Sequence, residues 1–230
     1  MKRGRRSERH EVKADVVLLA TADWANPFWT NKQHVAVELA RRGHRVLYVD
    51  SLGLRRPSAS QHDFGRILKR LVRGLRPPRR VRERLWVWSP LVIPLQNHSL
   101  VRLLNRWSLR LGLWLWTHRL HLRHDLLWTY NPMTTLLFPT TEFGTVVYHC
   151  VDEIGAQRGM PRAEIDAAEH ELLARADHCF VTAESLLDNR RDRCGSIHYF
   201  PNVADFDHFA RARSTETRIP EDLQRLGRPI

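Results

Sequence analysis

Short apolar segments of strand length alternate with longer amphipathic segments along most of this 230-residue chain. Residues 15–20 (DVVLLA) and 45–49 (RVLYV) are apolar runs typical of strands that are buried on both faces. Between them, residues 32–42 carry their apolar side chains on one face of a helix, and Gly43 is placed to end that helix. Because parallel strands need a right-handed crossover connection, residues 15–49 predict a βαβ unit.

The same alternation continues to residue 200. Further strands are predicted at 85–92 (interrupted at Pro90), 126–130, 145–148, 178–181 and 197–200, and further helices at 99–121, 163–176 and 185–189. In the helix at 163–176, Ile165, Ala168 and Leu172 are expected to face inward, and Glu164, Glu169 and Glu171 outward. Strands and helices in this order predict an α/β fold with a doubly wound, mostly parallel, Rossmann-like sheet.

The two ends of the chain differ in composition from this central region. Residues 1–13 are charged and basic and predict a disordered tail, so the domain is expected to span 14–210. Residues 211–230 are polar and resemble a linker toward a further C-terminal domain, with residues 227–230 as the entry to a strand. The alternative is a flexible tail.

Composition excludes several classes of protein. No uncharged apolar run reaches 18 residues, so no transmembrane helix is predicted, and residues 1–13 lack the apolar region of a signal peptide. The three cysteines have no metal-ligand spacing, and His118, His121 and His124 lie in an arginine-rich segment with Asp125 as the one carboxylate nearby. We therefore expect a cytoplasmic protein that binds no metal.

Positive charge is concentrated in the first half of the chain. Residues 1–124 hold 26 Lys and Arg against 8 Asp and Glu, whereas residues 125–230 are net negative. This asymmetry favours an anionic partner, either a membrane surface or nucleic acid, although an arginine-rich genome would also produce it.

The segment 64–84 indicates which anionic partner to expect. It holds nine Lys and Arg interleaved with apolar residues at near-helical spacing, as in a helix that lies on an anionic membrane, although a solvated basic loop has the same composition. Gly74 and the prolines at 77 and 78 interrupt it, which disfavours a nucleic-acid recognition helix. Residues 111–116 (LGLWLW) also suit a membrane interface, but we expect them to pack on the sheet.

Ligands of open parallel sheets bind beyond the carboxyl ends of the strands, and the first such loop here is 21–31. Its Trp29 is a candidate platform for a sugar or lipid, or a loop-packing residue. The loop enters the following helix near Thr30 or Asn31, either of which can cap it, and Lys32 is the first residue of the predicted helix. The free N–H groups there favour an anion or a sugar hydroxyl. The loop lacks G-x-G-x-x-G, and the chain lacks the P-loop and nucleophile-elbow motifs.

Two further loops follow the strands at 126–130 and 145–148. Asn131 opens the first, and His149, Asp152 and Glu153 lie in the second. A histidine three residues from a carboxylate can orient a hydroxyl or accept its proton, although such a pair is often structural.

Four motifs together resemble the opening half of bacterial group 1 glycosyltransferases with the GT-B architecture. They are NKQH (31–34) leading into ELARRGHRVLYVDSLGLRRP (38–57), VVYHCVDE (146–153), ARADHCFVTAESL (174–186) and FPNVADFDHF (200–209). Their order and spacing over residues 15–210 carry the resemblance, which is nearest to transferases that build teichuronic acid or capsule.

The resemblance implies the acceptor-binding half of an enzyme that transfers a sugar from a nucleotide-sugar to a surface-glycan or lipid-linked acceptor. It implies no cofactor beyond that donor substrate. Because acceptors in the resembling family are lipid-linked, it also supports the peripheral contact with the anionic inner membrane face that segment 64–84 predicts, and no nucleic-acid partner is expected. His149 and Asp152 match the cleft-facing motif and are the predicted catalytic residues. Relatives can have Asp at the position of His149, so Asp152 is the stronger candidate. The predicted substrate-binding residues are Trp29, Asn31, Lys32, Asn131 and Glu153.

The donor-binding half is absent, so the chain alone is expected to transfer no sugar. Two alternatives remain from the sequence: a non-catalytic module that binds an anionic partner, and a subunit that pairs with a separate donor-binding chain.

Overall fold

The computed structural model describes residues 13–52, 74, 76–93, 99–157 and 160–224. The chain forms two compact units, Met1–Phe200 and Pro201–Ile230. The boundary therefore falls ten residues before the predicted domain end at 210, because the last strand ends at Tyr199 and a new helix starts at Phe206. All but the last residue of the predicted basic tail 1–13 lies outside the described residues.

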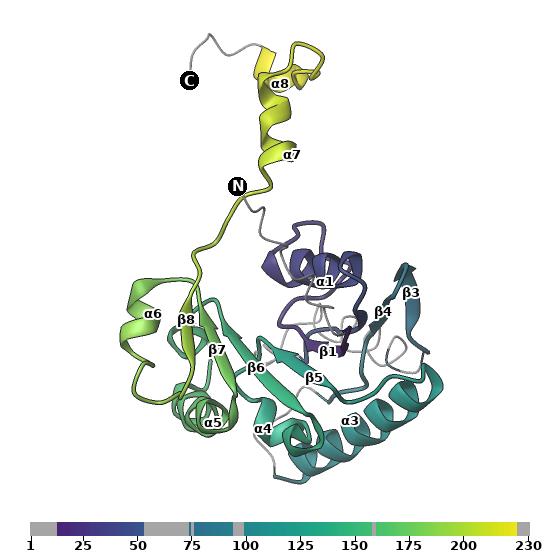
Figure 1. Ribbon diagram of the computed structural model, residues 1–230, viewed down its shortest axis with the longest axis vertical. Coiled ribbons are helices and arrows are strands. Elements are labelled where there is room, and N and C mark those ends of the chain that lie inside the picture. The colour runs from purple at the N-terminus through teal and green to yellow at the C-terminus, as the bar shows by residue number, and fades with distance from the viewer. Residues whose placement is uncertain (1–12, 53–73, 75, 94–98, 158–159, 225–230) are drawn as a thin grey trace, which may run out of the picture. The chain divides into compact units, whose positions relative to one another are not determined.

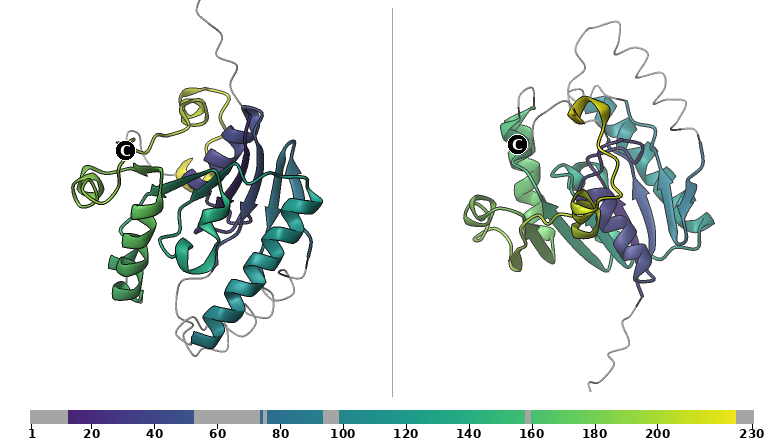
Figure 2. Two further views of the ribbon diagram at one scale, coloured as in Figure 1. Left: turned by 60° about the horizontal axis from the view of Figure 1, so that its bottom comes forward. Right: turned by 90° about the horizontal axis from the view of Figure 1, so that it is seen from above.

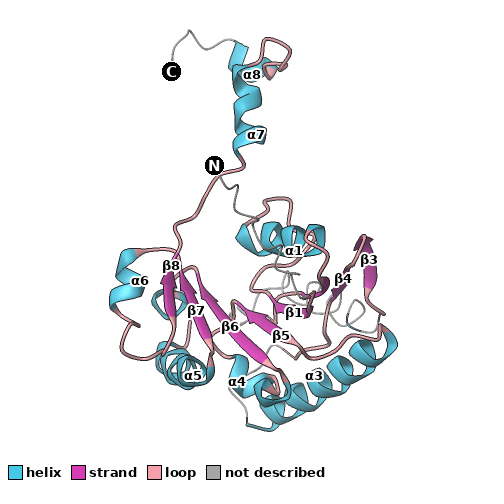
Figure 3. Cartoon of the chain, in the orientation of Figure 1, coloured by secondary structure: helices cyan, strands magenta, loops and turns pink. Residues whose placement is uncertain are grey.

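The first unit is built on one eight-stranded sheet with the order β3-β4-β2-β1-β5-β6-β7-β8 (Figures 1 and 3). Every neighbouring pair is parallel except β3 and β4, which are antiparallel. The strands are β1 (Asp15–Leu19), β2 (Arg45–Val49), β3 (Arg79–Arg82), β4 (Leu85–Trp88), β5 (Leu126–Thr129), β6 (Thr145–Cys150), β7 (His178–Val181) and β8 (Ile197–Tyr199). This order confirms the predicted mostly parallel α/β fold.

The helices connect the strands as predicted, with additional short turns. They are α1 (Asn31–Arg41), α3 (Ser99–Arg119), α4 (Thr134–Leu137), α5 (Arg162–Arg175) and α6 (Glu184–Asp188) in the first unit, and α7 (Phe206–Ala210) and α8 (Glu221–Gln224) in the second. Single 3₁₀ turns lie at Thr140–Glu142, Ile154–Ala156 and Arg211–Arg213. None of the helices in the described part of the chain is long and apolar enough to cross a membrane.

Two hydrophobic cores lie on opposite faces of the sheet. Helix α1 covers one face, where Ala36 and Ala40 pack with Val16, Leu18 and Tyr48. Helices α3, α4, α5 and α6 contribute to the core on the other face, over β1, β2 and β5 to β7 (Figures 1 and 2). The sheet is therefore doubly wound: successive side chains of the central strands point to opposite faces, and both faces are buried.

Local sequence explains where α1 begins and ends. Thr30 precedes the helix, and Gln33 Oε1 accepts hydrogen bonds from both the Thr30 N–H (3.1 Å) and the Thr30 hydroxyl (3.0 Å). Gly43 follows the helix with φ = 95°, a left-handed conformation that favours glycine. The predicted helix and its glycine terminator are confirmed.

The described part of segment 64–84 differs from the expected amphipathic helix. Residues 64–73 and 75 lie outside the described residues. Residues 79–82 form strand β3, which pairs with β4. Arg84 has φ = 59°, so a tight turn joins the two strands and the helical spacing predicted for this part of the segment is wrong.

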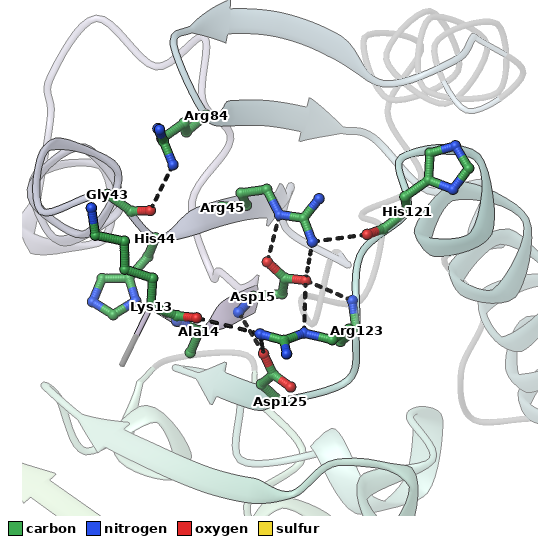
Figure 4. Close-up of polar contacts among 10 residues, drawn as sticks. All are labelled: Lys13, Ala14, Asp15, Gly43, His44, Arg45, Arg84, His121, Arg123 and Asp125. Carbon is green, nitrogen blue, oxygen red and sulfur yellow. Dashed lines mark hydrogen bonds and ion pairs between the residues drawn. The ribbon is translucent and has the colours of Figure 1, made fainter. Parts of the chain in front are cut away.

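An ion-pair network joins β1, β2 and the loop before β5 at the amino edge of the sheet (Figure 4). The buried carboxylate of Asp15 accepts hydrogen bonds from Arg45 and from the Arg123 backbone N–H (2.8 Å). Asp125 in turn accepts from the Asp15 N–H at 2.9 Å. The network lies at the opposite edge from the carboxyl ends of these strands, so its role is to hold the strand ends together.

Candidate functional site

The carboxyl ends of β1, β5 and β6 meet beside the start of α1, and four side chains gather there. The Lys32 ammonium lies 5.5 Å from the centre of the Tyr130 ring. The Tyr130 ring stacks on His149, with ring centroids 4.7 Å apart. The charge of Asp152 acts on Lys32. The structure thus brings together three of the predicted site residues, and it adds Tyr130, which the sequence analysis did not single out.

His149 lies inside β6, whereas the sequence predicted it in the following loop. It is half-buried, and its Nδ1 has no hydrogen-bond partner among the described residues. Burial, and secondarily the charge of Lys32, lowers the pKa of His149 to about 4. The imidazole is therefore neutral at pH 7 and can exchange a hydrogen bond with a hydroxyl group.

Lys32 is placed unfavourably for a merely structural residue. It is only 7% exposed and lies in the first turn of α1, which contains no acidic residue. Burial lowers the pKa of its ammonium, and the charge of Asp152 partly offsets this effect. A cation at a helix N-terminus also opposes the helix dipole. Buried groups with perturbed charge near a strand's carboxyl end indicate a functional site, here one suited to an anion.

An aromatic surface extends from His149 across β5, β7 and β8, on the same face of the sheet as α1. Trp128 stacks on Phe180 at 5.5 Å between ring centroids and meets the His149 ring edge-on at 5.8 Å. Phe180 continues the row to His198 and Phe200, each at 5.6 Å. His198 and Phe200 are exposed, so the row leads from the His149 side chain to solvent.

The loop after β1 holds Trp29 at the start of α1. The indole of Trp29 packs on Trp24 (5.1 Å between ring centroids) and is 37% exposed. The Trp24 N–H donates to Asp50 Oδ1 at 2.7 Å, which ties the loop to the end of β2. Asn31 is the first residue of α1 and is half-buried. Trp29 therefore has both a packing role and a free edge, and its prediction as a sugar platform stays a prediction.

Asn131 and Glu153 lie close to the cluster but make structural contacts. Asn131 is fully buried, and its Oδ1 accepts a hydrogen bond from the Met133 N–H at 2.9 Å, which shapes the turn before α4. The Glu153 carboxylate pairs with Arg190 at 2.9 Å. Neither side chain is directed to the Lys32 and His149 cluster by these contacts, and no observation tests their predicted role in substrate binding.

Arg190 is the centre of a buried charge network that the sequence analysis missed. Its guanidinium pairs with Glu169 Oε2 at 2.9 Å and with Glu153, and the Tyr148 hydroxyl also donates to Glu169. Burial alone would lower the pKa of Arg190, but Glu153 and Glu169 raise it overall. The prediction that Glu169 faces outward is wrong, because its side chain is buried and pairs with Arg190. The network holds the loop that carries Asp152.

Metal ligation has no counterpart in this part of the molecule. Within the residues that the structure describes, no three His, Cys, Asp or Glu side chains are grouped to hold an ion. Cys150, Cys179 and Cys194 are free and buried.

Comparison with known proteins supports the fold. No protein-family model matches the sequence, and no curated protein matches it. Among solved structures, a chain of sucrose-phosphate synthase from Thermosynechococcus elongatus aligns with a TM-score of 0.52 at 14% identity, covering 87% of this chain and 52% of that chain. A second, shorter chain of the same enzyme aligns over 86% of this chain and 94% of its own length, with 12% identity and a TM-score of 0.45.

The chain spans about half the length of the sucrose-phosphate synthase chain that aligns with a TM-score of 0.52. At 14% identity, the alignment bears on the course of the backbone and not on chemistry. Together with the strand order, it shows that the chain has an α/β fold with a mostly parallel, Rossmann-like sheet, similar to that of sucrose-phosphate synthase.

Proposed function

We propose that this chain is the acceptor-binding half of a GT-B glycosyltransferase that transfers a sugar from a nucleotide-sugar to a surface-glycan or lipid-linked acceptor. The observation that carries the proposal is the cluster of Lys32, His149 and Asp152 at the carboxyl ends of the strands, in a glycosyltransferase-like fold. The motif resemblance to teichuronic-acid and capsule transferases supports the choice of acceptor.

The proposed reaction is a displacement at the anomeric carbon of the donor sugar. A hydroxyl oxygen of the acceptor forms the new bond to that carbon, the bond from carbon to the phosphate oxygen breaks, and nucleoside diphosphate leaves with the electron pair. The hydroxyl proton passes to the Asp152 carboxylate, which lies exposed just after β6. Neutral His149 is half-buried and packs on Tyr130; its Nδ1 is fully buried, so the proposed hydrogen bond that orients the acceptor hydroxyl is made by Nε2.

Lys32 and the first N–H groups of α1 supply positive potential beside this reaction. An incoming phosphate would pair with the buried ammonium and so offset the cost of burying it. Lipid-linked acceptors carry such a phosphate, and the aromatic row from Trp128 to Phe200 offers apolar surface for a sugar ring or the start of a lipid chain. The site thus suits an acceptor that joins an anionic group to an apolar one.

The donor-binding half is proposed to come from sequence beyond these 230 residues or from a separate chain. The name of the structural neighbour denotes the synthesis of sucrose phosphate, a phosphorylated sugar, and this chain spans about half of that neighbour. A subunit that pairs with a donor-binding chain would use the same acceptor site, so the chemistry proposed for Asp152 is common to both arrangements.

Turnover of the assembled enzyme tests the proposal. In the chain joined to, or mixed with, its donor-binding half, Asp152→Asn should lower kcat at least about tenfold, because the base that accepts the proton is lost. Asp166→Asn is the matched control, since Asp166 is an exposed carboxylate on α5 that pairs with Arg162 at 3.5 Å.

The control should retain the wild-type rate, and thermal melting should show that both variants are folded. A wild-type rate in Asp152→Asn would remove this residue from the reaction. If the assembled protein transfers no sugar from any nucleotide-sugar but binds anionic ligands, the alternative of a non-catalytic anion-binding module is correct.

A further inference from the structure

Helix α3 carries a continuous apolar stripe on the side that faces away from the sheet. Each member lies three or four residues from at least one other member, so they are neighbours on one helix face. They are Leu100, Leu103, Leu104, Trp107, Leu111 and Trp114. Trp107 is 67% exposed and Trp114 is 61% exposed. A stripe from Leu100 to Trp114 is about 21 Å long at 1.5 Å per residue, far more than the scattered exposed side chains of an ordinary surface.

The opposite face of α3 is fixed in the protein, so the stripe cannot turn inward. Leu109 and Leu113 are buried in the core against β2, β4 and β5. Asn105 clamps the preceding segment, accepting from the Ile93 N–H and donating to the Ile93 carbonyl, both at 2.8 Å. Gly112 lies against the Trp88 ring, where an added Cβ would be only 2.4 Å from a ring carbon. The helix therefore has one face that belongs to the core and one that is left for a partner.

Charge indicates which partner the stripe fits. Helix α3 contains four arginines and no acidic residue. Arg106 and Arg110 lie along one border of the stripe, Arg102 is half-buried toward the core side of the helix, and Arg119 ends the helix. Arg106 donates to the Leu136 carbonyl at 2.9 Å and Arg110 pairs with Glu142 at 3.4 Å, so these arginines are anchored beside the stripe.

We propose that the outer face of α3 binds in the plane of an anionic membrane surface. Leucine side chains would enter the acyl boundary to a depth of about 5–10 Å, as in other interfacial helices. Trp107 and Trp114 would lie at headgroup level, where indole rings are favoured. The border of arginines would contact anionic headgroups. His118, which stacks on Trp114 at 5.9 Å between ring centroids with an interplanar angle of 6°, would extend the stripe by one turn.

A second copy of the chain is a poorer occupant, although the spacing of the stripe would also suit a helix partner. Two α3 helices packed through their stripes would bring arginine borders together with no acid on either helix to compensate. The inference rests on this surface and not on the proposed sugar transfer, so the two can fail separately. The membrane contact expected at residues 64–84 stays a prediction, because most of that segment lies outside the described residues.

Vesicle flotation of the 230-residue chain tests this proposal. One set of vesicles contains phosphatidylcholine alone. The other contains the same amount of phosphatidylcholine together with phosphatidylglycerol, and both are used in low salt. Wild type should float with the anionic vesicles, should float less with neutral ones, and should be released as salt is raised. The double variant W107S/W114S should lose about tenfold or more of the binding, because both interfacial anchors are removed.

The matched control is F206S/F209S, which removes two aromatic side chains of similar exposure (76% and 65%) from α7. It should bind as wild type does. Equal flotation of W107S/W114S and wild type, or an equal loss in the control, would overturn the proposal. So would a wild-type dimer in light scattering that W107S/W114S converts to monomer without vesicles, since the stripe would then be a protein interface.

Discussion

The buried pair of Arg190 and Glu169 gives the most quantitative test of the structure. Glu169→Gln keeps the size of the side chain and removes its charge. Among the residues that the structure describes, the buried Arg190 guanidinium then keeps the half-exposed Glu153 as its one remaining carboxylate partner. Removing one member of a buried ion pair costs about 3–5 kcal/mol, and the remaining pair with Glu153 should reduce this to about 2–4 kcal/mol. The Tyr148 hydroxyl also loses its charged acceptor.

Urea denaturation followed by circular dichroism measures this cost. With a slope of about 2–3 kcal/mol/M, the midpoint should fall by about 0.7–2 M while the slope stays unchanged. Glu171→Gln is the matched control on the same helix, because Glu171 pairs with Arg175 at 2.7 Å on the surface, where such pairs contribute about 0–1 kcal/mol. A midpoint for Glu169→Gln that lies within the error of the control would refute the buried network.

Two further predictions concern pH. The pKa of His149 is lowered to about 4 in the folded chain. In the unfolded chain the same side chain has a pKa of about 6.5. The unfolded state therefore binds the proton first, and wild type loses stability as pH falls from about 6.5 to 4. His149→Gln should remove about 2 kcal/mol of that loss by pH 5 in paired melting curves, and parallel curves for the two proteins would contradict the buried, neutral histidine. Burial alone would raise the pKa of the Asp15 carboxyl, but hydrogen bonds from Arg45 and the Arg123 N–H lower it overall. The ionised carboxylate therefore stabilises the fold above about pH 4, and this stabilisation is lost as pH falls further. Asp15→Asn should therefore cost about 2 kcal/mol at pH 7, with a gap to wild type that narrows below about pH 4; a gap that is constant with pH would show that the charge of Asp15 is not what stabilises the edge.

The sheet could be predicted because its strands are locally encoded. The runs at Asp15–Leu19 and Arg45–Val49 are apolar on both faces, and Gly43 marks the end of the helix between them. These signals depend on neighbours within a few residues. Strand β3 (Arg79–Arg82) gave no such signal, because three of its four residues are arginines. It pairs with β4 through the backbone, and Val81 packs against the core on the α1 face.

The errors in the sequence analysis share a physical cause. Glu169 follows the polar pattern of α5, and only its tertiary contact with Arg190, 21 residues away, reveals that it is buried. Residues 111–116 were expected to pack on the sheet, but this part of the helix has apolar residues on two opposite faces and only one of them faces the sheet. The structure buries Leu113 and exposes Leu111 and Trp114. Long-range contacts decide both cases, and no local pattern reports them.

The candidate site was partly predictable for the opposite reason. The rule that ligands bind at the carboxyl ends of parallel strands selected the loops that carry Lys32 and Asp152. It did not foresee that Tyr130 would lie between the ammonium of Lys32 and the ring of His149. It also did not distinguish the clustered residues from Asn131 and Glu153, whose side chains bond to the Met133 N–H and to Arg190.

The central claim is that this chain binds an anionic, sugar-bearing acceptor through Lys32. The most direct measurement is calorimetric titration of the 230-residue chain with a short-chain, water-soluble prenyl-phosphate-linked sugar. Saturable binding is predicted, weakened about tenfold or more in Lys32→Met, which is a loss of about 1.4 kcal/mol. Arg162→Met, which removes an exposed cation from α5, should bind as wild type does. Absence of saturable binding, or equal affinities for wild type and Lys32→Met, would contradict the account.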